Sequence, residues 1–121
     1  MPLKILTIED DPSITSFLNI LLTIYEMQVI IANDGATGIE KARTESPDLI
    51  LLDLMMPVID GWRVCQEIRA FSQVPIIVVS AVTSKEKIAD ALLAGANAYI
   101  EKPISIEDLV SQIKQFVADK S

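Results

Sequence analysis

The chain has 121 residues, of which 50% are hydrophobic, and a formal net charge of −7 at pH 7. This length and apolar content suit one domain with one sizeable core, whereas the acidic balance disfavours direct binding of nucleic acid, which needs Lys and Arg against phosphates. The sequence contains no histidine, which excludes a Ser-His triad, histidine metal ligands and a phosphohistidine on this chain.

Neither a membrane span nor a secretory leader is predicted. No apolar run is long enough to cross a bilayer, and no basic segment with a cleavage site opens the sequence. We therefore expect a cytoplasmic protein without a membrane partner. The single cysteine, Cys65, lies in a helical pattern and is expected in the core.

Short apolar runs are predicted to be strands. In chain order they lie at residues 3–8, 27–32, 49–52, 74–80 and 98–100. The third run, Leu-Ile-Leu-Leu, has no polar residue, which is typical of a strand buried on both faces of a parallel sheet.

A helical pattern follows each run, bounded by residues that start or end helices. In chain order these residues are Asp11 with Pro12, Gly35 with Pro47, Asp60 with Gly61, Ser84 with Gly95, and Ser105 with Asp108 before residues 106–117. Strands and helices alternate without a linker, which predicts an α/β fold: a (βα)5 doubly wound parallel sheet, in a flavodoxin-like three-layer sandwich. Right-handed crossovers favour the strand order 2-1-3-4-5, in a single domain over residues 1–121.

Polar residues stand at the ends of four predicted strands. Glu9 and Asp10 follow the first strand, Asp53 follows the third, Ser80 ends the fourth and Lys102 follows the last. Because the carboxyl ends of parallel strands meet at one edge of a sheet, these side chains are expected to converge there. Neighbouring carboxylates repel one another unless a cation lies among them, and all-oxygen ligands favour a hard ion such as Mg²⁺.

With this arrangement the chain resembles the receiver domain of two-component response regulators, and among them the chemotaxis-regulator-like members. The resemblance covers essentially the whole chain. It rests on motifs in the same order as in the family: Glu9-Asp10, Asp53 within Asp-Leu-Met-Met-Pro-x-x-Asp-Gly, Ser80-Ala81, Gly95-Ala96, Tyr99, and Lys102-Pro103. Each motif is weak alone, but their order and spacing together make a strong signal.

The resemblance implies a phosphorylation switch that works with Mg²⁺. Asp53 would accept a phosphoryl group from a phosphohistidine on a sensor histidine kinase or a phosphotransfer protein. Asp10 and the backbone carbonyl of Met55 would bind Mg²⁺ together with Asp53. Glu9 would act on the ion through water.

The resemblance also implies how the phosphoryl group is held and read. Lys102 would pair with one phosphoryl oxygen and Ser80 would hydrogen-bond another, while Tyr99 would turn inward when Ser80 shifts. The peptide bond between Lys102 and Pro103 is expected to be cis. The surface formed by the fourth helix, including Ile88 and Leu92, the last strand and the last helix would then change.

Two surfaces are expected to meet partners. The first helix is more apolar than one core face requires, and by resemblance Ile14 and Leu18, with Pro103 and Ile104, would contact the kinase.

On the responsive surface, the family's winged-helix transcription factors often carry two aspartates and an arginine. Here Asn97, Ala98 and Gln112 stand at those positions. We therefore expect this surface to bind a separate downstream protein, or to form a weak homodimer, and not to position a DNA-binding domain.

Each selected residue also has a purely structural interpretation. Lys102 would be a surface lysine, Ser80 a loop hydroxyl and Tyr99 a half-buried residue of an edge strand. For Asp11 and Trp62 the structural interpretation is the favoured one: a helix cap and a packing residue.

Two rival functions fit the sequence less well. Phosphatases of the haloacid dehalogenase type need a second Asp two residues after the nucleophile, and Met55 occupies that position. A receiver that only binds partners usually lacks one of the five site residues, and none is missing here. We therefore expect a switch that catalyses its own phosphorylation and not a turnover enzyme.

Overall fold

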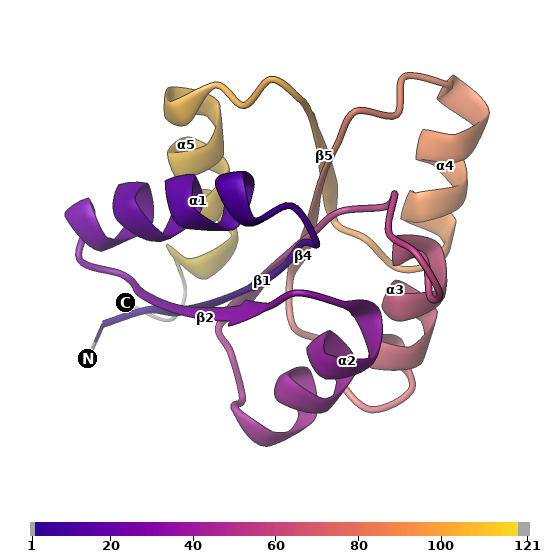
Figure 1. The fold of residues 1–121 in the computed structure, drawn as a ribbon, viewed down its shortest axis with the longest axis horizontal. Coiled ribbons are helices and arrows are strands. Elements are labelled where there is room, and N and C mark those ends of the chain that lie inside the picture. Colours follow the sequence, from indigo (N-terminus) through magenta and orange to yellow (C-terminus); the bar gives the residue numbers. More distant parts are fainter. Residues whose placement is uncertain (1, 119–121) are drawn as a thin grey trace.

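The computed structural model describes residues 2–118. Its strands are β1 (Lys4–Ile8), β2 (Gln28–Ala32), β3 (Leu49–Leu52), β4 (Ile76–Ser80) and β5 (Ala98–Glu101). Its helices are α1 (Pro12–Ile24), α2 (Gly35–Thr44), α3 (Gly61–Arg69), α4 (Lys85–Leu93) and α5 (Ile106–Val117). All strand pairs are parallel and the order is β2-β1-β3-β4-β5, as predicted (Figure 1).

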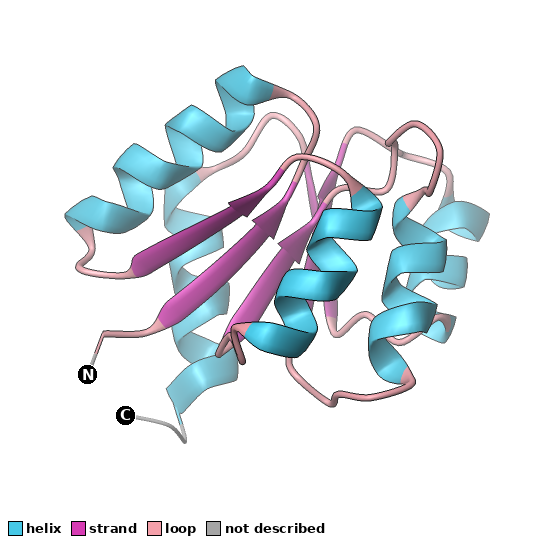
Figure 2. Ribbon diagram, turned by 60° about the horizontal axis from the view of Figure 1, so that its bottom comes forward, coloured by secondary structure: helices cyan, strands magenta, loops and turns pink. Residues whose placement is uncertain are grey.

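The sheet forms the middle of three layers. Helices α1 and α5 cover one face, whereas α2, α3 and α4 cover the other (Figures 1 and 2). Each face has its own apolar cluster, and all residues of β3 and β4 are buried. This explains why the third strand reads as an unbroken aliphatic run: it has no face toward water.

Side-chain caps fix where the helices begin. Asp11, Asp34 and Asp60 each accept a hydrogen bond from a backbone N–H in the first turn of α1, α2 and α3. Ser84 and Ser105 do the same for α4 and α5. Because helices start at the carboxyl edge of a parallel sheet, these caps also set the path of the loops that carry the polar strand ends.

Several local predictions are confirmed, whereas four strand boundaries differ slightly: β1 and β2 begin one residue later than predicted, β4 begins two residues later, and β5 ends one residue later. Cys65 is buried, Gly95 has a positive φ of 122° after α4, and the Lys102–Pro103 peptide bond is cis. Strand β4 begins at Ile76 and not at residue 74. The backbone N–H of Ile76 donates to Asn97 Oδ1 at 2.8 Å. Among the described residues, no helix has the length and apolar character needed to cross a membrane.

Candidate functional site

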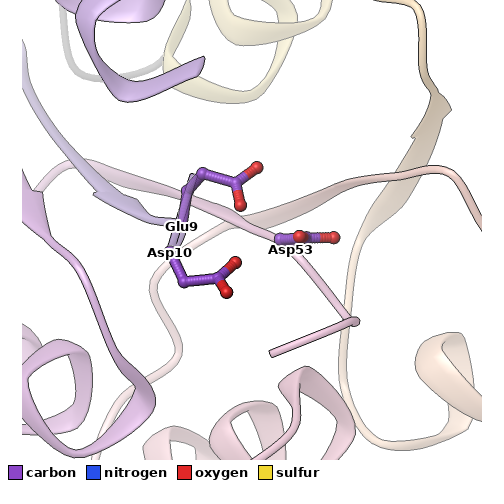
Figure 3. A group of neighbouring side chains, drawn as sticks. All are labelled: Glu9, Asp10 and Asp53. Carbon is purple, nitrogen blue, oxygen red and sulfur yellow. The ribbon is translucent and has the colours of Figure 1, made fainter. Parts of the chain in front are cut away.

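Three carboxylates converge at the carboxyl edge of the sheet (Figure 3). Glu9 and Asp10 follow β1 and Asp53 follows β3, and the pairing of these strands brings the Asp53 N–H to 3.0 Å from the Ile8 carbonyl. Each carboxylate has an oxygen within 4.8 Å of the others. Glu9 and Asp53 are buried, while Asp10 is exposed.

Lys102 brings a positive charge to this cluster. Its Nζ lies 2.6 Å from Glu9 Oε1 and 3.5 Å from Asp53 Oδ2. The backbone N–H of Lys102 donates to the Ser80 carbonyl at 2.9 Å, which fixes the start of its loop beside β4. Lys102 is therefore a partly buried lysine held by two acids, not the surface lysine of the structural interpretation.

The charges in this cluster are not balanced. Burial raises the pKa of Glu9 to about 7, an effect increased by the charge of Asp53 and opposed by Lys102. Burial by itself lowers the pKa of Lys102, but its contacts with Glu9 and Asp53 outweigh this and the net shift is upward. Lys102 thus stays protonated, and one ammonium faces three carboxyl groups.

The donor set fits a hard divalent cation. The three side chains offer only oxygen atoms, which Mg²⁺ prefers. An added cation would favour the ionised form of Glu9 against the burial, and the lesser effect of the Asp53 charge, that raise its pKa. The backbone of Met55 lies next to the cluster, because its N–H donates to Asp53 Oδ1 at 3.3 Å. The residues present can therefore bind a metal ion.

Ser80 places an unpartnered hydroxyl at the end of β4. The residue is fully buried, and its Oγ has no hydrogen-bond partner among the residues that the structure describes. A buried hydroxyl without a partner costs free energy, so such groups are rare in folded proteins. An acceptor delivered to this edge of the sheet would remove that cost.

Tyr99 connects β5 to the end of β4. It is half-buried, and its hydroxyl donates to the backbone carbonyls of Ser80 and Val82. Its ring packs against the apolar cluster beneath α2, α3 and α4. Burial raises the pKa of this phenol, as do the charges of Glu101 and Asp53. A movement of Ser80 would thus reach Tyr99 through a direct hydrogen bond.

The glycine of the Asp-Gly pair allows α3 to start directly beside Asp53. A Cβ on Gly61 would lie 2.3 Å from the Asp53 carbonyl oxygen and 2.6 Å from Leu54 Cα. Between Asp53 and Gly61 the chain forms a loop, in which the fully exposed Val58 has a φ of 70°. The sequence therefore needs Gly61 to hold the loop after Asp53 in place.

The first helix corrects one prediction. Leu18 is only 2% exposed and packs in the core, so it cannot contact a partner as expected. Phe17 occupies the exposed position instead and, with Ile14, Pro103 and Ile104, lines a hollow of about 380 Å³ next to Lys102. We call this the α1 hollow. The excess of apolar residues in the first helix indicated an exposed apolar surface. The sequence did not show which of these residues face solvent.

Two residues of α4 keep the places expected of them. Leu92 is 46% exposed and Ile88 is half-buried, and neither belongs to the two apolar clusters of the core. Both therefore remain available on the predicted responsive surface.

Two long-range hydrogen bonds were not predicted from the sequence. Trp62 Nε1 donates to the Lys87 carbonyl at 3.0 Å and so joins α3 to α4. Arg69 Nη2 donates to Asn97 Oδ1 at 2.9 Å. Asn97 therefore has a structural role. Both contacts join residues more than twenty positions apart, and no local pattern marks them.

Known proteins resemble this chain in both sequence and fold. The sequence model described as "Response regulator receiver domain" matches residues 5–114. The chain is 42% identical over 111 residues to "Probable transcriptional regulator ycf27" of Porphyridium aerugineum, covering 92% of the chain and 46% of that protein. It is 40% identical over 111 residues to "Response regulator ArlR" of Staphylococcus saprophyticus, covering 92% of the chain and 50% of that protein.

Solved structures agree over nearly the whole chain. A two-component response regulator from Clostridium difficile superposes with a TM-score of 0.93 at 28% identity and covers 96% of both chains. The receiver domain of a sensor histidine kinase from Pseudomonas aeruginosa, with a magnesium ion coordinated in its active site cleft, gives 0.90 at 29% identity, covering 98% of this chain and 99% of that one. The chain spans about half the length of the curated relatives it matches.

Proposed function

The chain belongs to the family of response regulator receiver domains, whose general function is that of a phosphorylation-dependent switch, and on this premise we propose that Asp53 is its phosphoacceptor. The observation that carries the proposal is the convergence of Asp53 with Glu9, Asp10 and Lys102 at the carboxyl edge of the sheet. The fold around one sheet also supports a single receiver domain over residues 1–121.

The proposed step is transfer of a phosphoryl group to a side-chain oxygen of Asp53. The new bond forms between this oxygen and phosphorus, while the phosphorus–nitrogen bond of a phosphohistidine on the donor protein breaks. Lys102 Nζ, 3.5 Å from Asp53 Oδ2, is placed to pair with a phosphoryl oxygen, and the buried Ser80 hydroxyl is available to donate to another. The donor would be a sensor histidine kinase or a phosphotransfer protein.

Asp10, Asp53 and the Met55 carbonyl would hold Mg²⁺, with Glu9 acting through water. When bound, the ion would neutralise charge on the phosphoryl oxygens. Of these groups, Glu9 has a second task, because its contact with Lys102 Nζ keeps that ammonium next to Asp53.

Phosphorylation would be read through Ser80 and Tyr99. If the end of β4 shifts as the Ser80 hydroxyl turns toward a phosphoryl oxygen, the hydrogen bond from the Tyr99 hydroxyl to the Ser80 backbone carbonyl would adjust with it. The α4, β5 and α5 surface would then bind a separate downstream protein or form a weak homodimer, with no direct contact to nucleic acid from these residues. Family membership supports a cytoplasmic location and a role as a switch and not as a turnover enzyme.

Acetyl phosphate labelling followed by intact-mass measurement tests the proposal. With Mg²⁺ the protein should gain the mass of one phosphoryl group, and the gain should disappear in EDTA and in Asp53→Asn. Asp11→Asn is the matched control, because Asp11 is an exposed helix cap of the same charge next to the cluster. Labelling of Asp53→Asn at the normal rate, or equal labelling in EDTA, would contradict the proposal.

A further inference from the structure

Helix α4 buries little apolar surface. It lies beside α3 on one face of the sheet (Figures 1 and 2). Over the described residues, Ala91 is the only residue of α4 that is buried, whereas Leu92 and Leu93 are exposed. Because most of the stability of a helix in a protein comes from packing of its apolar face, α4 needs other contacts to stay in place.

Hydrogen bonds from α3 supply such contacts. Trp62, Cys65 and Arg69 follow one another at intervals of three and four residues, so they share one face of α3. Each of these side chains donates to a backbone carbonyl of α4 or of the residues directly after it. In the same order the acceptors are Lys87 at 3.0 Å, Ala94 at 3.5 Å and Gly95 at 3.0 Å.

The C-terminal end of α4 is firmly held by Arg69. The guanidinium also donates to the Ser72 carbonyl at 3.2 Å and to Asn97 Oδ1 at 2.9 Å. The stem of the arginine lies against the backbone, because a Cβ on Gly95 would be 2.6 Å from Arg69 Cγ. This end of the helix is therefore fixed between α3 and the start of β5.

The N-terminal end of α4 depends on fewer contacts. The Trp62 indole reaches the carbonyl of Lys87, in the first turn. The loop before the helix is held by the Tyr99 hydroxyl, which donates to the Val82 carbonyl. If Tyr99 moves when Ser80 shifts, the hydrogen bond from Trp62 is what still holds this end of the helix on α3.

Trp62 is also positioned by the loop that carries Asp53. The residue before it, Gly61, donates its N–H to the Leu54 carbonyl at 2.9 Å and leaves no room for a Cβ against the Asp53 carbonyl. A contiguous path therefore runs from Asp53 through Gly61 and Trp62 to α4, separate from the path through Ser80 and Tyr99.

We propose that the Trp62 indole is a latch that holds the N-terminal half of α4 in its resting position, and that the responsive surface changes when this hydrogen bond opens. The proposal rests on the proposed function of Asp53. On phosphorylation α4 would turn about its C-terminal end, where Arg69 keeps its contact with Gly95. A bond present only in the resting state opposes the phosphorylated state, so its removal should favour that state.

Amide hydrogen exchange of the unphosphorylated chain tests the latch. Trp62→Phe keeps an aromatic ring but removes the donor, and should speed exchange at residues 88–91 by about two- to tenfold, as expected for loss of one hydrogen bond. Gly95 and Ala96, at the end held by Arg69, should exchange as before. Arg63→Gln is the matched control, because Arg63 is the next residue of α3 but pairs with Glu67 of its own helix.

Binding of beryllofluoride, a mimic of the phosphoryl group, tests the regulatory role in the presence of Mg²⁺. Trp62→Phe should bind it more tightly by about the same factor as its exchange increases, an effect that a merely structural contact would not have. The chain has a single tryptophan and hence one indole N–H resonance. In the unmodified chain, beryllofluoride should shift this resonance and speed its exchange with water.

Three results would overturn the latch: unchanged exchange of α4 in Trp62→Phe, equal or weaker binding of beryllofluoride by this variant, or an indole resonance that stays unaltered while the amides of α4 shift. An unmodified chain that does not bind beryllofluoride at all would instead contradict the proposed function, and the regulatory role of Trp62 with it. The two failures are therefore distinguishable.

Discussion

At the scale of single residues, the Ser80 hydroxyl is the least satisfied group of the site. It is fully buried without a hydrogen-bond partner among the described residues, so Ser80→Ala should leave the free energy of unfolding unchanged or raise it by about 1 kcal/mol. Thr7→Val is the matched control, because the Thr7 hydroxyl is equally buried but donates to the Ile30 carbonyl at 3.4 Å. The control should lose about 1 kcal/mol in urea unfolding. Equal losses in both variants would show that Ser80 has a partner in the resting protein.

The raised pKa of Glu9 predicts how the free energy of unfolding depends on pH. Burial raises its pKa in the folded protein from 4.5 to about 7, so the folded state binds the proton more tightly than the unfolded state does. The corresponding stability is fully present below pH 4.5 and is lost as the pH rises through about 7. In EDTA, the free energy of unfolding should therefore fall by about 2 to 3 kcal/mol across this range.

Urea unfolding at several pH values checks this prediction, with Glu9→Gln as the comparison. The chain has no histidine to add a slope in the same range. Glu9→Gln should flatten the dependence, and Mg²⁺ should do so as well, because a cation favours the ionised carboxylate. A stability that rises between pH 5 and 7, or an equal slope in Glu9→Gln, would contradict the assigned cause.

At the scale of elements, the α1 hollow is the expected contact with the phosphodonor protein. Phe17→Glu should slow phosphotransfer from a phosphohistidine protein about tenfold or more, since an exposed apolar contact residue becomes charged, and should leave acetyl phosphate labelling unchanged. Ile24→Glu is the matched control on the same helix, because Ile24 is 70% exposed but does not line the hollow. Rates from both donors, measured by phosphoprotein gel, check this. Equal slowing with both donors would indicate a damaged fold.

The elements were predictable where local chemistry decides them. The aliphatic run of β3, the cap at Asp11 and the positive φ after α4 at Gly95 all follow from short patterns. The burial of Leu18 could not be predicted in this way. Helix α1 is apolar around most of its circumference, and only its packing against β1 and α5 decides which side chains are buried. The start of β4 depends on the Asn97 side chain, which lies far along the chain.

At the scale of the whole molecule, the topology explains why so much of the site was predictable. A parallel sheet collects the carboxyl ends of all its strands at one edge. The strand order therefore places Glu9 and Asp53 at the ends of adjacent strands, and Lys102, at the same edge, reaches across the end of β4 to both acids. The individual contacts could not be predicted, because they depend on packing between distant residues. The 2.6 Å contact between Lys102 and Glu9, for example, joins residues 93 positions apart. The unpartnered Ser80 hydroxyl and the bond from Trp62 to α4 likewise follow from packing and have no sequence signature.

The same topology makes the site acidic beyond the three cluster carboxylates. Asp11, Asp34 and Asp60 cap helices that begin at this edge of the sheet. Hydrogen bonds to Ser13 and Thr37 lower the pKa values of Asp11 and Asp34, so both caps stay ionised around the site. A divalent cation is thus expected to bind more weakly as salt screens this field.

Locating the phosphoryl group on the chain tests the central claim most directly. After labelling with acetyl phosphate and Mg²⁺, borohydride reduces an aspartyl phosphate to homoserine, which peptide mass spectrometry assigns to one residue. We predict homoserine at Asp53 alone, with Asp10 and Asp11 unmodified. Homoserine at Asp10 or Asp11, or a labelled protein in which Asp53 remains aspartate, would contradict the account.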